Sequence, residues 1–218
     1  MKKVFAFLIL LLSCLFPLGC NSVPQNRQTY FSSEDVAVLN IFSYDGKGES
    51  KYGIKNLGHS FLSITNTNNE SIFVAGKEIK AGEELYFGTW SLSLHFGVWF
   101  NVECNYIELY NKYNGRISLA KGVTITDLNK ISEYILNNDT WNPLKNCSHF
   151  AISVWNSVAR ESERLNLGFI NTPGNLKNQI LNFETYVLNK EIINAGDCGY
   201  FADLTEDAFV FEGGEIYV

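Results

Sequence analysis

One cysteine at the start of a predicted helix is the residue best placed to do chemistry. Cys147 follows Asn146, a residue type favoured at helix N-caps, and Pro143 prevents the helix from extending upstream. The unpaired backbone N–H groups and the dipole at a helix start favour the thiolate, which is the nucleophilic form of cysteine. Cys147 also falls on the apolar stripe of this helix, where a small cysteine commonly serves packing alone. The residues therefore leave two interpretations open, a nucleophile and a packing residue.

A thiol nucleophile requires a base, and the sequence contains three histidines. His149 lies about 200° around the helix from Cys147, at about 100° per residue, so its ring points away from the sulfur and we reject it as the base. His59 begins a predicted strand directly after Gly58, where an imidazole can face a helix N-terminus. His95 falls in a predicted loop and is left open as the base, as the group that orients the base, or as a surface histidine.

Two short motifs carry a resemblance to a known family. They are Gly58-His59-Ser60-Phe61 and Asn146-Cys147-Ser148-His149-Phe150-Ala151. Together they resemble the circularly permuted NlpC/P60-type papain-like hydrolases, a group that includes the lecithin:retinol acyltransferase-like and the bacterial YiiX-like proteins. The resemblance covers residues 35–160, in which the histidine precedes the cysteine as in that permutation. It implies that Cys147 is the nucleophile and His59 the general base.

In that family a third polar residue orients the base and usually lies on the strand after the histidine. Ser71 is the polar residue nearest that place, and His95 is the other candidate for the orienting group. Trp141, just before the predicted nucleophile helix, is expected to line a substrate groove.

Alternating apolar residues predict a mostly antiparallel sheet in the first half of the chain. The predicted strands are 35–43, 59–65, 71–75 as a hairpin partner, 84–90, 97–104 with an extension to 110 left open, and 116–120. The spacing then becomes helical, which predicts helices over 126–137, 146–160 and 172–181, with a tail strand near 208–211. Strands followed by helices are typical of an α+β fold, and the resemblance implies a papain-like core.

The first twenty residues have the layout of an export signal. Met1-Lys2-Lys3 is basic, residues 4–13 are almost wholly apolar, and Leu18-Gly19-Cys20 places a small residue before a cysteine. This ending resembles the bacterial lipobox, which implies a lipid on Cys20 that anchors the protein to a membrane of the cell envelope; plain secretion is the alternative. We therefore expect a signal peptide over 1–19, a polar tether over 20–33 and one domain over 34–218.

The cysteine count leaves the redox state open. If Cys20 carries lipid, the exported chain keeps Cys104, Cys147 and Cys198, and an odd number leaves at least one thiol unpaired. A disulfide between Cys104 and Cys198 is compatible with this count but is not selected by it.

Composition narrows the function further. The chain has 218 residues and a net charge of −6, which disfavours a broad nucleic-acid surface. No CxxC, HExxH or GxxxxGK motif occurs, so neither a metal nor a cofactor is expected. One function that remains is an envelope-anchored cysteine hydrolase or acyltransferase for an amide or ester bond, in a peptidoglycan peptide or a lipid or peptide acyl group. The other is a non-catalytic envelope-binding lipoprotein on the same scaffold, which the lack of an assigned orienting residue favours.

Overall fold

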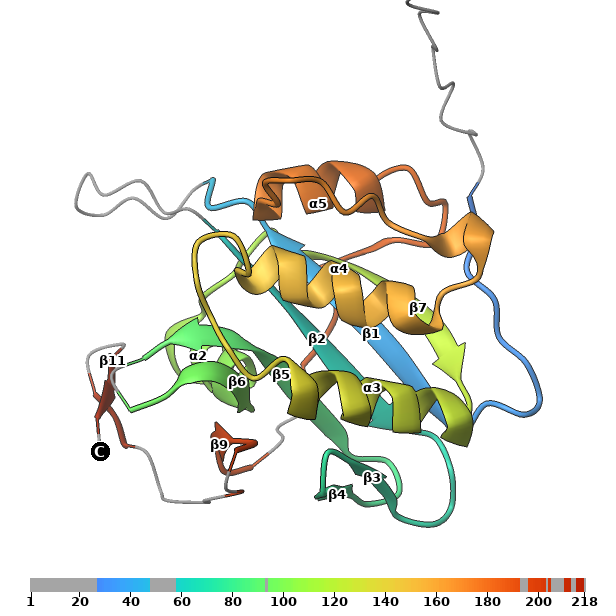
Figure 1. Cartoon of the computed structure of the whole chain (residues 1–218), viewed down its shortest axis with the longest axis horizontal. Coiled ribbons are helices and arrows are strands. Elements are labelled where there is room, and N and C mark those ends of the chain that lie inside the picture. The colour runs from blue at the N-terminus through green and yellow to red at the C-terminus, as the bar shows by residue number, and fades with distance from the viewer. Residues whose placement is uncertain are drawn as a thin grey trace, which may run out of the picture.

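The computed structural model describes residues 27–47, 58–92, 94–192, 196–202 and 204, together with the backbone of 210–212 and 215–217. Within these residues the fold is α+β with a mostly antiparallel sheet, as the sequence predicts (Figure 1). Neighbouring strands of the seven-stranded sheet all pair antiparallel. Their order is β8 (Val187–Leu188), β7 (Ile117–Val123), β1 (Ala37–Tyr44), β2 (His59–Asn66), β5 (Glu84–Ser91), β6 (Phe96–Phe100) and β9 (Gly199–Tyr200).

Side chains alternate between the two faces of the sheet, and each face has its own apolar core. One face is covered by α3 (Ile125–Asn137), α4 (Cys147–Val158) and α5 (Pro173–Ile180), which lie in front of the sheet in Figure 1. The shorter α2 (Val102–Tyr110) packs on the opposite face. Along β1, Ile41 therefore packs with the three helices, whereas its neighbour Phe42 packs with the α2 core.

Local capping explains why the three predicted helices form. Thr124 and Asp127 make a reciprocal capping box at the start of α3. The Asn146 side chain caps α4, and the Thr172 side chain caps α5 in the same way. The predictions over 126–137, 146–160 and 172–181 are confirmed to within one or two residues at each end.

The segment predicted as a strand over 97–104, with the extension to 110, instead divides into β6 and α2. Asn101 has a left-handed backbone with a φ of 58°, which ends the strand, and its Oδ1 accepts the backbone N–H of Tyr86 at 3.1 Å. The strand prediction is wrong because Val102, Cys104 and Tyr106 alternate along the sequence as strand residues do. In the structure these three residues belong to α2, and all three side chains are buried.

Residues 71–75 do not pair with β2 as predicted. The strand β3 (Ile72–Val74) forms a separate hairpin with β4 (Lys77–Ile79), and β2 pairs with β5. Ala75 and Gly76 have φ values of 48° and 87°, and positive φ at both central residues is what a tight two-residue hairpin turn requires. The strand β4 escaped prediction because it is three residues long and begins with two charged side chains.

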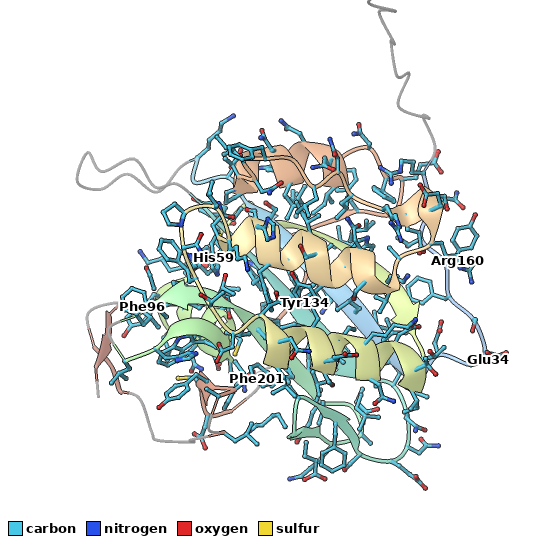
Figure 2. All side chains as sticks on the ribbon, in the orientation of Figure 1. Glu34, His59, Phe96, Tyr134, Arg160 and Phe201 are labelled. Atoms are coloured by element: carbon cyan, nitrogen blue, oxygen red, sulfur yellow. The ribbon has the colours of Figure 1, made fainter. Side chains whose placement is uncertain are left out.

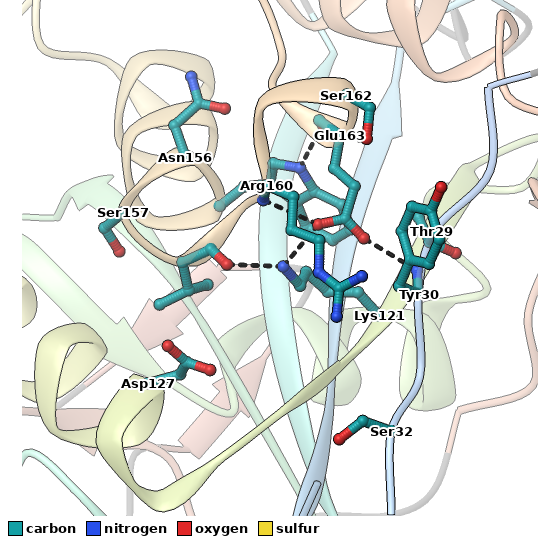
Figure 3. Close-up of polar contacts among 12 residues, drawn as sticks. Thr29, Tyr30, Ser32, Lys121, Asp127, Asn156, Ser157, Arg160, Ser162 and Glu163 are labelled. Carbon is teal, nitrogen blue, oxygen red and sulfur yellow. Dashed lines mark hydrogen bonds and ion pairs between the residues drawn. The ribbon is translucent and has the colours of Figure 1, made fainter. Parts of the chain in front are cut away.

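Part of the segment predicted as a tether over 20–33 contacts the domain, beginning at Arg27. The backbone N–H of Tyr30 donates to Glu163 at 2.9 Å (Figure 3). Glu163 lies in the 3₁₀ helix η1 (Glu161–Glu163), is fully buried, and forms an ion pair of 2.8 Å with the buried Lys121 (Figure 3). The Arg27 side chain donates to two backbone carbonyls next to Glu163. Residues 27–33 therefore belong to the folded domain.

Some predictions fall outside the described residues. Residues 1–26, which include the predicted signal peptide and Cys20, are among these, and so is part of the tail strand near 208–211. The described part of the tail contains β10 (Val210–Glu212), paired with β11 (Glu215–Tyr217). Of the helices in the described residues, none combines the length and the apolar content that a membrane crossing would need.

Candidate active site

The sheet opens at the end of β2 that carries His59. Pairing between β2 and β1 runs over the whole strand, but pairing between β2 and β5 covers only Leu62 to Thr65. Within the described part of the chain, the first residues of β2 therefore have no partner strand on the β5 side. The N-terminal end of α4 lies at this opening, where the backbone N–H of Ser60 donates a hydrogen bond to the sulfur of Cys147. Figure 2 shows His59 beside the same end of α4.

Cys147 is the first residue of α4 and is partly exposed. Asn146 holds this end of the helix in two ways. Its Oδ1 accepts the backbone N–H of His149 at 3.0 Å, and its Nδ2 donates to the carbonyl oxygen of Asn171 at 2.8 Å. The nucleophile candidate is therefore fixed to the loop that precedes α5 as well as to the sheet.

His59 is buried, with 7% of its surface exposed, and its position depends on the glycine before it. Gly58 has a φ of 77°, a conformation that side-chain-bearing residues rarely adopt. A Cβ atom at this residue would overlap the carbonyl oxygen of Tyr44 and would lie 2.9 Å from the backbone carbonyl carbon of Asp45. Only glycine lets the chain pass this close to the end of β1 and enter β2 with His59 in place.

Glu103, from the first turn of α2, orients the His59 ring. The distance from His59 Nε2 to Glu103 Oε1 is 2.9 Å, which leaves Nδ1 as the ring nitrogen available to Cys147. The same carboxylate oxygen accepts the indole N–H of Trp90 at 2.8 Å. Glu103 is fully buried, and its Oε2 has no hydrogen-bond partner among the described residues. A Cβ atom at Gly88 would overlap Oε1, so the glycine on β5 makes room for the carboxylate.

Aromatic rings enclose the His59 imidazole. The ring centroid of Trp90 lies 4.3 Å from that of His59, and those of Tyr113 and Phe61 lie at 5.6 and 6.0 Å. These rings exclude water from the hydrogen bond between His59 and Glu103. A charged hydrogen bond is stronger in such a low-dielectric environment than it is in water.

The charges of the site shift the pKa values of both Cys147 and His59 toward the ion pair. Burial alone would lower the pKa of His59, but the thiolate of Cys147 and the hydrogen bonds to Cys147 and Glu103 raise that pKa to about 9. Burial likewise would raise the pKa of Cys147, but the charge and the hydrogen bond of His59 outweigh it, so the pKa is lowered. The hydrogen bonds from the Ser60 backbone and the Ser148 side chain add to this lowering. Both shifts favour a thiolate beside an imidazolium over a neutral thiol beside a neutral imidazole.

The structure places the other orienting candidates elsewhere. His95 Nε2 bonds to Asp139 Oδ1 at 2.7 Å, and its ring stacks on Tyr200 at 4.7 Å, so it forms a separate histidine–carboxylate pair. Ser71 is exposed and precedes the β3–β4 hairpin. That hairpin follows the far end of β2, about 24 Å along the strand from His59 at about 3.4 Å per residue. Among the described residues, the side chain bonded to His59 Nε2 is therefore that of Glu103, and the structure does not bring Ser71 or His95 together with His59.

The remaining candidates can also be placed. His149 turns toward Asn171, with 3.4 Å between its Nδ1 and the amide nitrogen. Trp141 is half-buried in the connection between α3 and α4. Cys104 and Cys198 lie buried in the α2 core as thiols, without the disulfide that the cysteine count allows, and burial raises the pKa of Cys198 to about 12.

Sequence reasoning missed Glu103 and Trp90. The available signal was a single carboxylate in the segment from Phe100 to Ile107, whose other residues are apolar or asparagine, because a buried charge requires a partner. A cavity of about 570 Å³ lies near the β3–β4 hairpin, and its lining does not include Cys147, His59 or Glu103.

Neither a metal-binding arrangement nor a similarity to known proteins assigns a function to this site. Within the described part of the chain, no group of three or more His, Cys, Asp or Glu side chains is arranged to hold a metal ion. No protein-family model, no curated protein and no solved structure matches the chain, so the resemblance to permuted NlpC/P60-type hydrolases stays a prediction.

Proposed function

We propose that the protein is a cysteine hydrolase or acyltransferase that acts on an amide or ester bond through a thioester on Cys147. The observation that carries this proposal is the arrangement of Cys147, His59 and Glu103: Cys147 and His59 shift each other's pKa toward the ion pair, and His59 Nε2 lies 2.9 Å from Glu103 Oε1. A nucleophile, a base and a group that orients the base, bonded in that order, are what activation of a thiol requires.

The reaction follows from these positions. The thiolate of Cys147 attacks the carbonyl carbon, a C–S bond forms, and the oxyanion is stabilised by the backbone N–H groups in the first turn of α4. The intermediate collapses with cleavage of the C–N or C–O bond, and the His59 imidazolium gives its Nδ1 proton to the leaving group. Water or an acceptor amine then attacks the thioester and gives a proton to His59, which restores the thiolate–imidazolium pair.

The non-catalytic alternative has less support from this geometry. It drew on the lack of a third polar residue, and Glu103 fills that role beside His59. A buried charged group costs desolvation free energy, and apolar residues of similar volume commonly give equal or greater stability. A binding module gains nothing from this cost, whereas an activated thiol depends on it.

The proposal extends to the fold family and to the site of action. The order of His59 before Cys147, and the helix N-terminus packed against an antiparallel sheet, support a permuted papain-like core. The apolar run before Cys20 supports a lipid anchor at the cell envelope, with no nucleic acid as partner. Peptidoglycan stem peptides and lipid or peptide acyl groups are the substrates that such a location offers.

Acylation of the thiol by a small activated ester tests the proposal on the full-length chain. p-Nitrophenyl acetate is mixed with wild-type protein, with His59→Ala and with His95→Ala, and acetyl groups on the Cys147 peptide are counted by mass spectrometry. His95→Ala is the matched control, because it also removes a histidine bonded to a carboxylate. We expect acetyl-Cys147 at pH 7 in the wild type and the control, and at least tenfold slower formation in His59→Ala, since pairing with the base contributes this much or more.

A Cys147 thiol that resists acetylation at neutral pH would refute the proposed function. Equal rates in the wild type and His59→Ala would do the same, because the thiol would then react without its base.

A further inference from the structure

Three buried hydroxyl groups form a row behind the Cys147 sulfur. Ser148 on α4, Ser60 on β2 and Ser43 on β1 each have 0% of their surface exposed. The oxygen of Ser60 lies 3.0 Å from that of Ser148 and 3.4 Å from that of Ser43, and Ser43 Oγ lies 2.6 Å from the carbonyl oxygen of Pro173. At the other end, Ser148 directly follows Cys147 in the chain, and a hydrogen bond from its side chain helps to lower the pKa of the Cys147 thiol. The row therefore connects the sulfur to the first turn of α5.

The direction of each hydrogen bond follows from counting protons. A carbonyl oxygen only accepts, so Ser43 donates its proton to Pro173 and can only accept from Ser60. Ser60 and Ser148 have one proton each, and two arrangements use both. In the first, Ser60 donates to Ser148 and Ser148 donates to the sulfur. In the second, Ser148 donates to Ser60 and Ser60 donates to Ser43.

The charge on the sulfur decides between these arrangements. A thiolate is a strong acceptor, and no water reaches it from this buried side, so the first arrangement supplies a charged hydrogen bond. An acylated sulfur is a weak acceptor, and the second arrangement then satisfies both hydroxyls without it. The 3.0 Å contact between Ser60 and Ser148 is shared by both states, whereas the longer 3.4 Å contact to Ser43 is needed only in the second.

We propose that Ser148 and Ser60 are positioning residues whose hydroxyl protons turn toward the Cys147 thiolate and turn away when the sulfur is acylated. This inference rests on the proposed function, because it requires a thiolate at Cys147. Ser148 acts on the sulfur directly, and Ser60 acts through Ser148 by fixing the direction of its proton.

The test measures the pH dependence of alkylation of Cys147 by iodoacetamide in the full-length chain, with the Cys147 peptide quantified by mass spectrometry. In Ser148→Ala we expect the apparent pKa of Cys147 to rise by about one unit, a tenfold change in the ionisation constant, because a hydrogen bond to a charged group is lost. In Ser60→Ala the rise is smaller. Ser148→Thr keeps the hydroxyl and restores the wild-type profile.

The matched control is Ser63→Ala, which removes a buried hydroxyl from the same strand on the face away from α4. Ser63 bonds to Glu84 and Asn40, so its loss leaves the pH profile of Cys147 unchanged. Cooperative urea unfolding checks that each variant is folded, and Ser60→Ala decides the matter if Ser148→Ala does not fold.

Two outcomes overturn the inference and differ from each other. If the wild type shows a lowered pKa that neither serine variant raises, the hydroxyl row has no such role and the proposed function stands. If the wild-type thiol titrates at its ordinary value, and His59→Ala does not change it, the proposed function fails and the inference fails with it.

Discussion

Replacing Glu103 with glutamine removes the charge behind His59 and keeps the shape of the site. The glutamine Oε1 can still accept from His59 Nε2 and from the indole N–H of Trp90, which now bond to one carboxylate oxygen at 2.9 and 2.8 Å. The new amide group would occupy the place of Oε2, which has no partner among the described residues. Glu103→Gln therefore tests the electrostatic role of Glu103 with little change in packing.

The size of the effect follows from the hydrogen bond. A hydrogen bond to a charged group stabilises by about 1.5–3 kcal/mol and an ordinary one by about 0.5–1.5 kcal/mol, so replacing the carboxylate with a neutral acceptor costs the imidazolium about 1.25 kcal/mol. One pKa unit corresponds to 1.36 kcal/mol. We therefore expect the pKa of His59 to fall from about 9 in the wild type to about 8 in the variant. The ratio of the ion pair to the neutral pair falls about tenfold with it.

Alkylation of Cys147 with two reagents measures this shift in the full-length protein. Iodoacetate is an anion that the imidazolium attracts, so its rate falls when His59 loses its proton, whereas neutral iodoacetamide reports the thiolate alone. The rate with iodoacetate should fall with an apparent pKa of about 9 in the wild type and about 8 in Glu103→Gln. Glu108→Gln makes the same chemical change on the exposed side of α2 and should leave the profile unchanged.

If the rate of alkylation by iodoacetate falls at the same pH in Glu103→Gln as in the wild type, the electrostatic role of Glu103 is refuted. Loss of cooperative unfolding in that variant would assign Glu103 a structural role instead.

Three further predictions concern the same group of residues. Trp90→Phe keeps an aromatic ring near His59 but removes one donor to Glu103, so urea unfolding should show about 1 kcal/mol less stability. The rate of alkylation by iodoacetate should still fall with an apparent pKa near 9. A decrease of this apparent pKa as large as in Glu103→Gln contradicts the prediction. Gly88→Ala places a methyl group against the Glu103 carboxylate and 3.3 Å from the Cβ of Phe61. We expect urea unfolding to show about 1–3 kcal/mol less stability, and acetylation of Cys147 to be slower. Unchanged acetylation would show that the Glu103 side chain moves to make room for the methyl group. Considered alone, the raised pKa of His59 stabilises the folded state fully below pH 6.5, and this stabilisation is lost as the pH rises through about 9. The lowered pKa of Cys147 stabilises the folded state fully above pH 9.0, and this stabilisation is lost as the pH falls. Between pH 6.5 and about 9, Cys147 and His59 together hold one proton in both the folded and the unfolded state. The difference in unfolding free energy between the wild type and Cys147→Ala/His59→Phe should therefore be constant in this range and should decrease as the pH is lowered from 6.5. A steady decrease of this difference from pH 7 to 9 would contradict the ion pair.

The parts of the fold that could be predicted are those with local signals. The helices α3, α4 and α5 each begin at a side-chain cap, and the long strands have the alternation of a two-faced sheet. The helix over 102–110 could not be predicted, because its buried residues Val102, Cys104 and Tyr106 alternate along the sequence as strand residues do. The choice between strand and helix is made at Asn101, whose side chain bonds to Tyr86 in β5 and to the backbone of Asp197, far away in the sequence. Tertiary contacts therefore override the local pattern.

The residues of the candidate site also differ in whether a local signal in the sequence marks them. Cys147 and His59 lie at element ends, where a cap residue and a positive-φ glycine leave a mark in the sequence. Glu103 has no such mark, because its role depends on how α2 packs beneath β5. The two glycine positions differ for the same reason: Gly58 could be interpreted from its place before a strand, whereas Gly88 is required by a carboxylate fifteen residues later in the chain.

The burial of Glu103 fits a role in a reactive site better than a role in stabilising the fold. A fully buried carboxylate with one oxygen lacking a partner among the described residues costs free energy, and nothing on α2 offsets that cost except its bonds to His59 and Trp90. The glycine at residue 88 adds to the cost, since glycine within a strand is itself unfavourable. Both costs are explained if the imidazole must remain charged beside a thiolate, and neither is explained by packing alone.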